Sequence, residues 1–147
     1  MKTLLLASLL VAACGISRVV AESIPLEKWA EHHAEASKAL GEWVKSHPVA
    51  AREFFEWDGH HPERSQLFVT WTIEHPKEGI EAYVRVHQGE PFLDRIMERH
   101  APAAREFMAW CRDHAPAARA LMEHSRGLEW AGRHLYREYW NLEEPHK

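Results

Sequence analysis

The residues best suited to chemistry in this 147-residue sequence are its twelve histidines. A neutral imidazole nitrogen is a good ligand for zinc, copper or nickel. Two pairs of histidines are adjacent, His32 with His33 and His60 with His61. Neighbouring residues on a helix point in different directions, so a pair normally offers a metal one ligand, although Gly59 relaxes this limit for the second pair. These four histidines are therefore candidate ligands for weakly bound zinc, copper or nickel.

Six histidines recur at a spacing of fourteen residues that is interrupted once. They are His33, His47, His61, His75, His100 and His114. Packed helices lie about 8 to 10 Å apart, whereas zinc needs nitrogen atoms about 2.0 to 2.1 Å away. We therefore expect the recurrent histidine to be a joint residue that caps the next helix, as at His47, His75, His100 and His114. A row of metal or haem ligands is the alternative.

The surroundings of three joint histidines can also be predicted. His47, His100 and His114 have no carboxylate three residues ahead. A tryptophan or another apolar residue stands four positions before each of them. We therefore expect these three imidazoles to be neutral and partly buried against their neighbours, with no acidic partner.

Established catalytic signatures are absent from the sequence. It contains no His-Glu-x-x-His for a catalytic zinc, no Cys-x-x-Cys-His for covalent haem, no Gly-x-Ser-x-Gly and no glycine-rich phosphate loop. Cys111 has no nucleophile signature around it and is expected to be a small buried apolar residue. Histidine and glutamate three residues apart, as at His60 and Glu63, are typical of solvated helix surfaces. The sequence predicts a non-enzymatic protein without a dedicated cofactor.

The elements that position these histidines follow from the tryptophans. Trp29, Trp43, Trp57 and Trp71 lie fourteen residues apart, and after one unit shorter by three residues the pattern resumes with Trp110. Counted from each tryptophan, position five is histidine, position nine is small and position twelve is apolar. These separations trace one stripe of a helix. We predict an all-α fold, with these five tryptophans in the core of an array of short helices built from this 14-residue repeat, stacked as a small α-solenoid or an irregular helical bundle.

Prolines predict where the helices begin, because proline is accepted in a first turn but costs about 3 kcal/mol in a helix interior. The expected starts are Pro48, Pro62, Pro76, Pro91, Pro102 and Pro116. We expect a first helix over 24–44, then helices of roughly 9 to 12 residues, then a closing helix over 128–141. Gly59 and Gly89 are expected to stop helices. Kinks inside longer helices are an alternative, above all at His75 and Pro76.

The first residues resemble an export signal. Lys2 precedes an apolar run over 4–13 that is too short to span a bilayer. The sequence ending at Cys14, Val-Ala-Ala-Cys, resembles the lipobox of bacterial lipoproteins. This resemblance implies a signal peptide over 1–13, lipid on Cys14 and a linker over 14–23. Ordinary cleavage after a signal peptide over 1–21 is the alternative.

The charge balance and the repeat together lead to a functional hypothesis. The chain has 18 lysines and arginines against 22 aspartates and glutamates, and neither sign forms a block, which argues against a nucleic-acid partner. We expect a helical repeat domain over 24–141 and a tail over 142–147. The predicted function is to present a binding face to a protein, peptide or envelope component. The predicted location is the bacterial periplasm or outer membrane, with only a lipid anchor in the membrane. The alternative is a histidine-based periplasmic metal-binding or metal-sensing protein.

Overall fold

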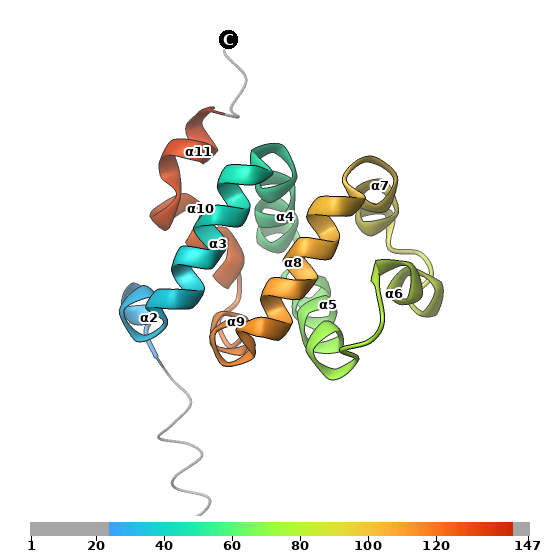
Figure 1. Ribbon diagram of the computed structural model, residues 1–147, viewed down its shortest axis with the longest axis horizontal. Coiled ribbons are helices and arrows are strands. Elements are labelled where there is room, and N and C mark those ends of the chain that lie inside the picture. Colours follow the sequence, from blue (N-terminus) through green and yellow to red (C-terminus); the bar gives the residue numbers. More distant parts are fainter. Residues whose placement is uncertain (1–23, 143–147) are drawn as a thin grey trace, which may run out of the picture.

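The computed structural model describes the backbone of residues 24–142 and the side chains of residues 24–140 (Figure 1). This part of the chain is all-α, as predicted, with ten helices packed together and no strand. The helices are α2 (Leu26–His32), α3 (Ala34–Ser46), α4 (Pro48–His60), α5 (Pro62–Glu74), α6 (Ile80–Val86), α7 (Pro91–Arg99), α8 (Ala101–Asp113), α9 (Ala115–Met122), α10 (Gly127–Leu135) and α11 (Arg137–Leu142). No helix among the described residues is long and apolar enough to cross a membrane.

A single residue separates many consecutive helices, and its backbone serves both of them. At His47, between α3 and α4, φ is −136° and ψ is 63°. Its N–H donates to the Trp43 carbonyl at 2.9 Å, and its carbonyl accepts from the Ala51 N–H at 2.8 Å. The imidazole makes no capping hydrogen bond, so the expected side-chain cap is wrong there. One backbone unit closes one helix and opens the next, and the same geometry recurs at His33, His61, His100 and His114.

Two expected long helices are interrupted at such joints. The helix expected over 24–44 breaks at His33, although alanine and not proline follows it. The closing helix expected over 128–141 breaks at Tyr136, whose N–H donates to the Gly132 carbonyl at 3.3 Å. The joint therefore does not require the His-Pro sequence. The joint is marked by a residue whose ψ is positive, 56° at His33 and 37° at Tyr136, and prolines alone reveal only some of the joints.

The helix start expected at Pro76 is also wrong. Helix α5 ends at Glu74, residues 75–79 form a turn, and α6 begins at Ile80. Arg112 of α8 explains the turn, since its guanidinium donates to the carbonyls of Thr72 at 3.1 Å, of His75 at 2.9 Å, and of Glu78. These carbonyls are satisfied by a side chain from a distant helix, so the chain need not re-enter a helix at the proline.

Gly59 does not stop a helix, because α4 continues to His60. A Cβ atom at this position would collide with the Glu129 carboxylate of α10. The glycine therefore permits the close approach of α4 and α10, which pack against each other. Gly89, by contrast, lies in the loop before α7 with a φ of 91°, a conformation that favours glycine.

The core forms where two runs of helices pack against each other. Helix α8 packs against α3, α4 and α5, and α9 packs against α2 and α5 (Figure 1). Phe54 and Phe107 are completely buried, with ring centroids 4.9 Å apart, and Trp43 lies 5.1 Å from Phe107. The five repeat tryptophans are at most 9% exposed. Aromatic burial on this scale accounts for why helices of thirteen residues or fewer are held in place.

Candidate functional site

Three tryptophans make the same polar contact with a neighbouring helix. The indole N–H of Trp29 donates to the Ala117 carbonyl, that of Trp43 to Ala103, and that of Trp110 to Ala36, each at 2.9 Å. Each accepting alanine is the third residue of its helix. The bonds from Trp43 and Trp110 are reciprocal, so α3 and α8 run antiparallel, side by side. The repeated tryptophan thus binds a first-turn carbonyl of an antiparallel neighbour.

This pattern is absent at Trp57 and at Trp71, because neither indole N–H donates to a carbonyl among the described residues. Moving fourteen residues forward from Trp43 and fourteen back from Ala103 pairs Trp57 with Gly89, which lies in the loop before α7 and not in a helix. The Trp57 Nε1 atom is buried, and no described atom accepts its hydrogen. Its ring stacks on Phe92 instead, with the centroids 4.7 Å apart. The residue at the position that the pattern requires thus lies outside a helix.

A groove of about 480 Å³ lies next to Trp57, between α4, α5 and α7. Trp57 and Phe92 contribute aromatic surface to its lining. Its charged lining consists of three arginines and three glutamates. These are Arg64, Arg95, Arg99, Glu53, Glu56 and Glu90. The groove therefore lies beside Trp57, one of the two repeat tryptophans that lack the indole hydrogen bond.

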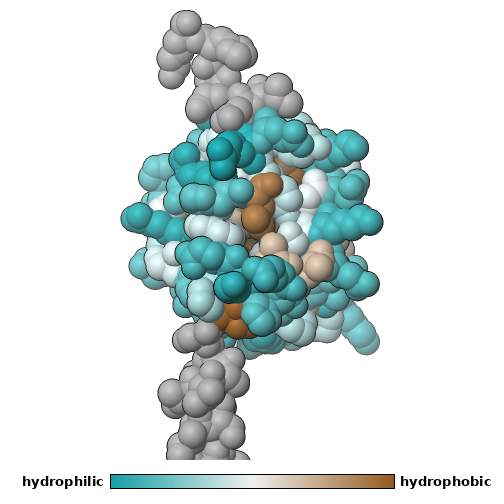
Figure 2. Space-filling view, turned by 90° about the vertical axis from the view of Figure 1, so that its left-hand side faces the viewer, coloured by the Kyte–Doolittle hydropathy of each residue, from teal (hydrophilic) through white to brown (hydrophobic). Residues whose placement is uncertain are grey.

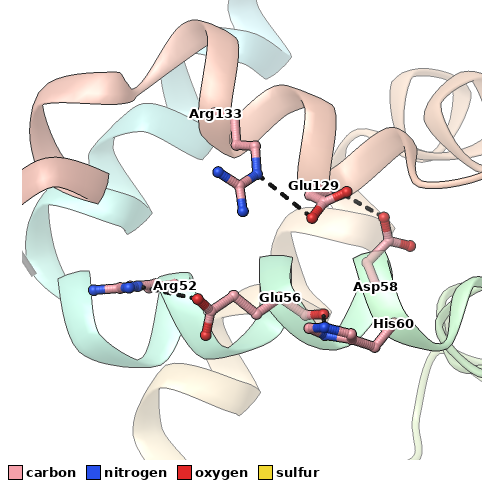
Figure 3. Close-up of polar contacts among 6 residues, drawn as sticks. All are labelled: Arg52, Glu56, Asp58, His60, Glu129 and Arg133. Carbon is pink, nitrogen blue, oxygen red and sulfur yellow. Dashed lines mark hydrogen bonds and ion pairs between the residues drawn. The ribbon is translucent and has the colours of Figure 1, made fainter. Parts of the chain in front are cut away.

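Each glutamate in the groove already has a partner within the chain. The Glu90 carboxylate accepts from the Phe92 N–H at 3.2 Å and lies 3.8 Å from Arg64. Glu56 lies 3.3 Å from Arg52 on the same helix (Figure 3). Glu53 lies 4.0 Å from the His100 ring. Glu90 and Glu56 are therefore paired with arginines, whereas Glu53 faces only an imidazole at 4.0 Å among the described residues.

Two of the arginines are much less engaged. Arg95 is exposed, lies 5.9 Å from the Phe92 ring centroid, and makes only a long 3.5 Å contact with the Pro91 carbonyl. Arg99 is exposed and has no hydrogen bond or ion pair with any residue in the described part of the chain. The two residues are one helical turn apart on α7, so their side chains share a face. The groove thus offers positive charge that no residue in the described part of the chain neutralises.

The histidine pairs lie in two different hollows. His60 and His61 line the groove, and the His60 Nδ1 atom lies 2.9 Å from the Glu56 carbonyl (Figure 3). His32 and His33 line a second hollow of about 430 Å³ next to α8. Burial, and then the nearby His32, lower the pKa of His33 below 6.5. Among the residues whose side chains are described, no three histidines, cysteines or acids are arranged to hold a metal ion. Metal binding by these pairs stays a prediction.

The surroundings expected for the joint histidines are wrong at two positions. The His47 Nε2 atom lies 3.1 Å from the Glu106 carboxylate, and the His100 ring faces Glu53. Both carboxylates belong to other helices, which is why spacing along the sequence could not reveal them. His114 is half-buried, with its ring centroid 6.1 Å from that of Trp110.

His75 differs from the other joint histidines because its ring packs directly on its tryptophan. The ring centroids of His75 and Trp71 are 4.4 Å apart and the planes are nearly parallel. The His75 Nδ1 atom lies 2.9 Å from the Trp71 carbonyl. This imidazole therefore contacts both the ring and the last-turn backbone of α5, and it is exposed on its other side.

A buried carboxylate was missed by the sequence analysis. Asp58 of α4 is 1% exposed and accepts from the Glu129 N–H at 2.9 Å, at the start of α10, and from the Ser65 hydroxyl (Figure 3). Burial raises its pKa above 3.8, although these hydrogen bonds oppose the shift. Asp58 thus caps a helix seventy residues away in sequence, and it does not line the groove. Its position beside Gly59 resembles a turn, so no local signal indicated this role.

The structure describes Cys111 but not Cys14. Cys111 is completely buried with a free thiol, and burial raises its pKa, so it is a poor nucleophile. Cys14 and the expected leader lie outside the described residues. The site is therefore defined by the groove and not by a reactive cysteine.

Comparisons with protein families, with curated proteins and with solved structures found no match to this chain. One face of the molecule offers no alternative to the groove as a binding surface. The face formed by α2, α3, α10 and α11 is mostly hydrophilic, with apolar residues in small separate patches (Figure 2). On that face no broad apolar surface competes with the groove as a place for a partner to bind.

Proposed function

We propose that this chain is a non-enzymatic, exported binding protein whose groove between α4, α5 and α7 receives a segment of a protein partner. Its helices form an array derived from the 14-residue repeat. The packing of α8 across α3, α4 and α5 supports an irregular bundle over an open solenoid. Export follows from the leader, and lipid on Cys14 would tether the domain to a membrane.

One observation carries this proposal: the groove lies beside Trp57, whose buried indole N–H has no acceptor among the described residues. Three of the five repeat tryptophans donate their N–H groups to carbonyls of neighbouring helices, and Trp57 is one of the two that do not donate to a described residue. Buried polar groups without partners are uncommon, and departures from a protein's own local pattern concentrate at functional sites. The groove volume of about 480 Å³ also falls in the range typical of ligand sites.

The lining supports binding in preference to catalysis. No serine, threonine or cysteine lines the groove, so it offers none of the usual hydroxyl or thiol nucleophiles. Two of its glutamates pair with Arg64 and Arg52, and the third lies 4.0 Å from the His100 ring. The remaining features are aromatic surface and uncommitted guanidinium groups, both of which are frequent at the centre of protein interfaces.

A peptide-display experiment tests the proposal. A random peptide library would be selected on the purified protein, and the affinities of the selected peptides measured by fluorescence anisotropy. Arg95→Trp, which places a bulky ring in the groove, should weaken binding at least about tenfold. Arg119→Trp, at an exposed position on α9 outside the groove, is the matched control and should leave the affinity unchanged. Failure to select any peptide, or peptides that bind Arg95→Trp normally, would overturn the proposal.

A further inference from the structure

The chemistry of the groove suggests which kind of segment it binds, provided that it binds a peptide as proposed above. The carboxylates in its lining are matched to donors or cations of the protein, as described for Glu53, Glu56 and Glu90. Arg64 is matched to Glu90. Arg95 and Arg99 remain without a carboxylate partner in the described part of the chain. A bound segment therefore meets two guanidinium groups without a carboxylate partner and one carboxylate, that of Glu53, whose only polar contact with a described residue is an imidazole at 4.0 Å.

The two arginines are well placed to act together. They lie four residues apart on α7, so their Cβ atoms are about 5 to 6 Å from each other. Arg95 also lies near the Phe92 ring, a contact that favours the flat guanidinium over a lysine. Guanidinium groups bind carboxylates through two parallel hydrogen bonds, and such bonds are roughly twice as strong as neutral ones. The arrangement suits two carboxylates at a similar separation.

We infer that the groove binds an acidic peptide segment whose two carboxylates pair with Arg95 and Arg99. In an extended segment, side chains two residues apart on one face are about 6.6 Å apart, which matches the arginine spacing. In a helical segment, carboxylates four residues apart match it as well. The segment backbone lies along Phe92 and the exposed edge of Trp57.

The net charge of the protein does not oppose this assignment at physiological salt. The chain carries a formal charge of −4, which repels an acidic partner at long range. The Debye length is about 8 Å at 0.15 M salt, so distant charges are screened while direct contacts with Arg95 and Arg99 persist. Binding should therefore depend mainly on these two side chains.

Three labelled peptides that differ only in charge test the inference. One carries alternating glutamate and serine, the second has glutamine in place of glutamate, and the third has lysine. The glutamate peptide should bind at least about tenfold more tightly than the glutamine peptide, and the lysine peptide most weakly. The double variant Arg95→Gln/Arg99→Gln should bring the glutamate peptide to within about twofold of the glutamine peptide. Arg85→Gln/Arg119→Gln removes the same charge from exposed positions outside the groove, and should keep the preference.

The other outcomes separate this inference from the proposed function. Equal binding of the glutamate and glutamine peptides, lost with Arg95→Trp, would overturn the acidic assignment and leave peptide binding intact. Failure of all three peptides, together with failure of the library selection, would overturn both. Inorganic polyphosphate that displaces the glutamate peptide, and binds as tightly through the same arginines, would replace the peptide assignment with a general polyanion site.

Discussion

Helices α3 and α4 carry the same tryptophan motif, but the contact of α3 with α8 differs from the contact of α4 with α7. Trp43 and Trp57 occupy equivalent positions of the repeat, and each is 5% exposed. Trp43 donates to the Ala103 carbonyl, while the N–H of Trp57 has no acceptor among the described residues. The difference lies in the facing helix. Ala103 is in the first turn of α8, whereas the equivalent residue facing Trp57, Gly89, is in the loop before α7. Satisfaction of a buried donor thus depends on the partner element. A hollow of about 300 Å³ also lies beside Trp43, so the two contacts differ in the indole hydrogen bond and not in the presence of a hollow.

The largest expected effect is the loss of the tryptophan in the complete contact. Trp43→Ala removes a ring packed on Phe54, Phe55 and Phe107, and it should lower the free energy of unfolding by about 3 to 5 kcal/mol. Leu67→Ala is the control, because this leucine is 49% exposed and its loss should cost less than about 0.5 kcal/mol. Chemical denaturation measures both variants. A loss below about 1 kcal/mol for Trp43→Ala would mean that the neighbouring rings close the space.

A smaller effect isolates the hydrogen bond itself. Trp43→Phe and Trp57→Phe make the same chemical change at equivalent positions, but only the first removes an indole bond to a buried carbonyl. Trp43→Phe should therefore cost about 1 kcal/mol more than Trp57→Phe in the free energy of unfolding. Paired denaturation curves under identical conditions give the difference. Equal losses would show that the Trp57 N–H has an acceptor, such as water, in solution.

Local patterns predicted the class of the fold but not all of its boundaries. The fourteen-residue spacing and the small residue at position nine correctly indicated helices. The break at His33 lacks a proline, so the proline rule could not find it. The turn at 75–79 depends on Arg112, more than thirty residues further on. Such long-range contacts decide helix ends without leaving a signal in the neighbouring sequence.

The candidate site was visible from the sequence only in part. His60 and His61 were singled out, and both line the groove. Arg95 and Arg99 were not, because two cations four residues apart on a helix are usually a solvated surface. They matter because no described residue of another helix places a carboxylate next to either arginine. The slip in the repeat after Trp71 was visible in the sequence, but it did not predict that the indole bond would be missing at Trp57.

The smallest expected effect is the change of folding stability with pH, and its sign differs between His33 and Asp58. The pKa of His33, at the joint before α3, is lowered below 6.5 by burial and then by His32. The unfolded chain therefore binds more protons at this residue near its ordinary pKa, so the stability contribution is full above pH 6.5 and declines as pH falls through that value. The pKa of Asp58, in α4, is raised above 3.8 by burial. Its contribution is full below pH 3.8 and is lost as pH rises through the folded-state pKa.

Of these two groups, only His33 makes the protein less stable when the pH falls from 8 to 5. His33→Gln removes this titrating imidazole while keeping a polar side chain at the joint, so the variant should lose less stability than the wild type on acidification. His134→Gln, at an exposed position on α10, is the matched control and should follow the wild type. Unfolding free energies at the two pH values give the comparison. A wild type that gains stability relative to His33→Gln on acidification would mean that protonated His33 has an acidic partner, for which the candidates are the three acids that line the same hollow, Glu31, Glu35 and Asp113.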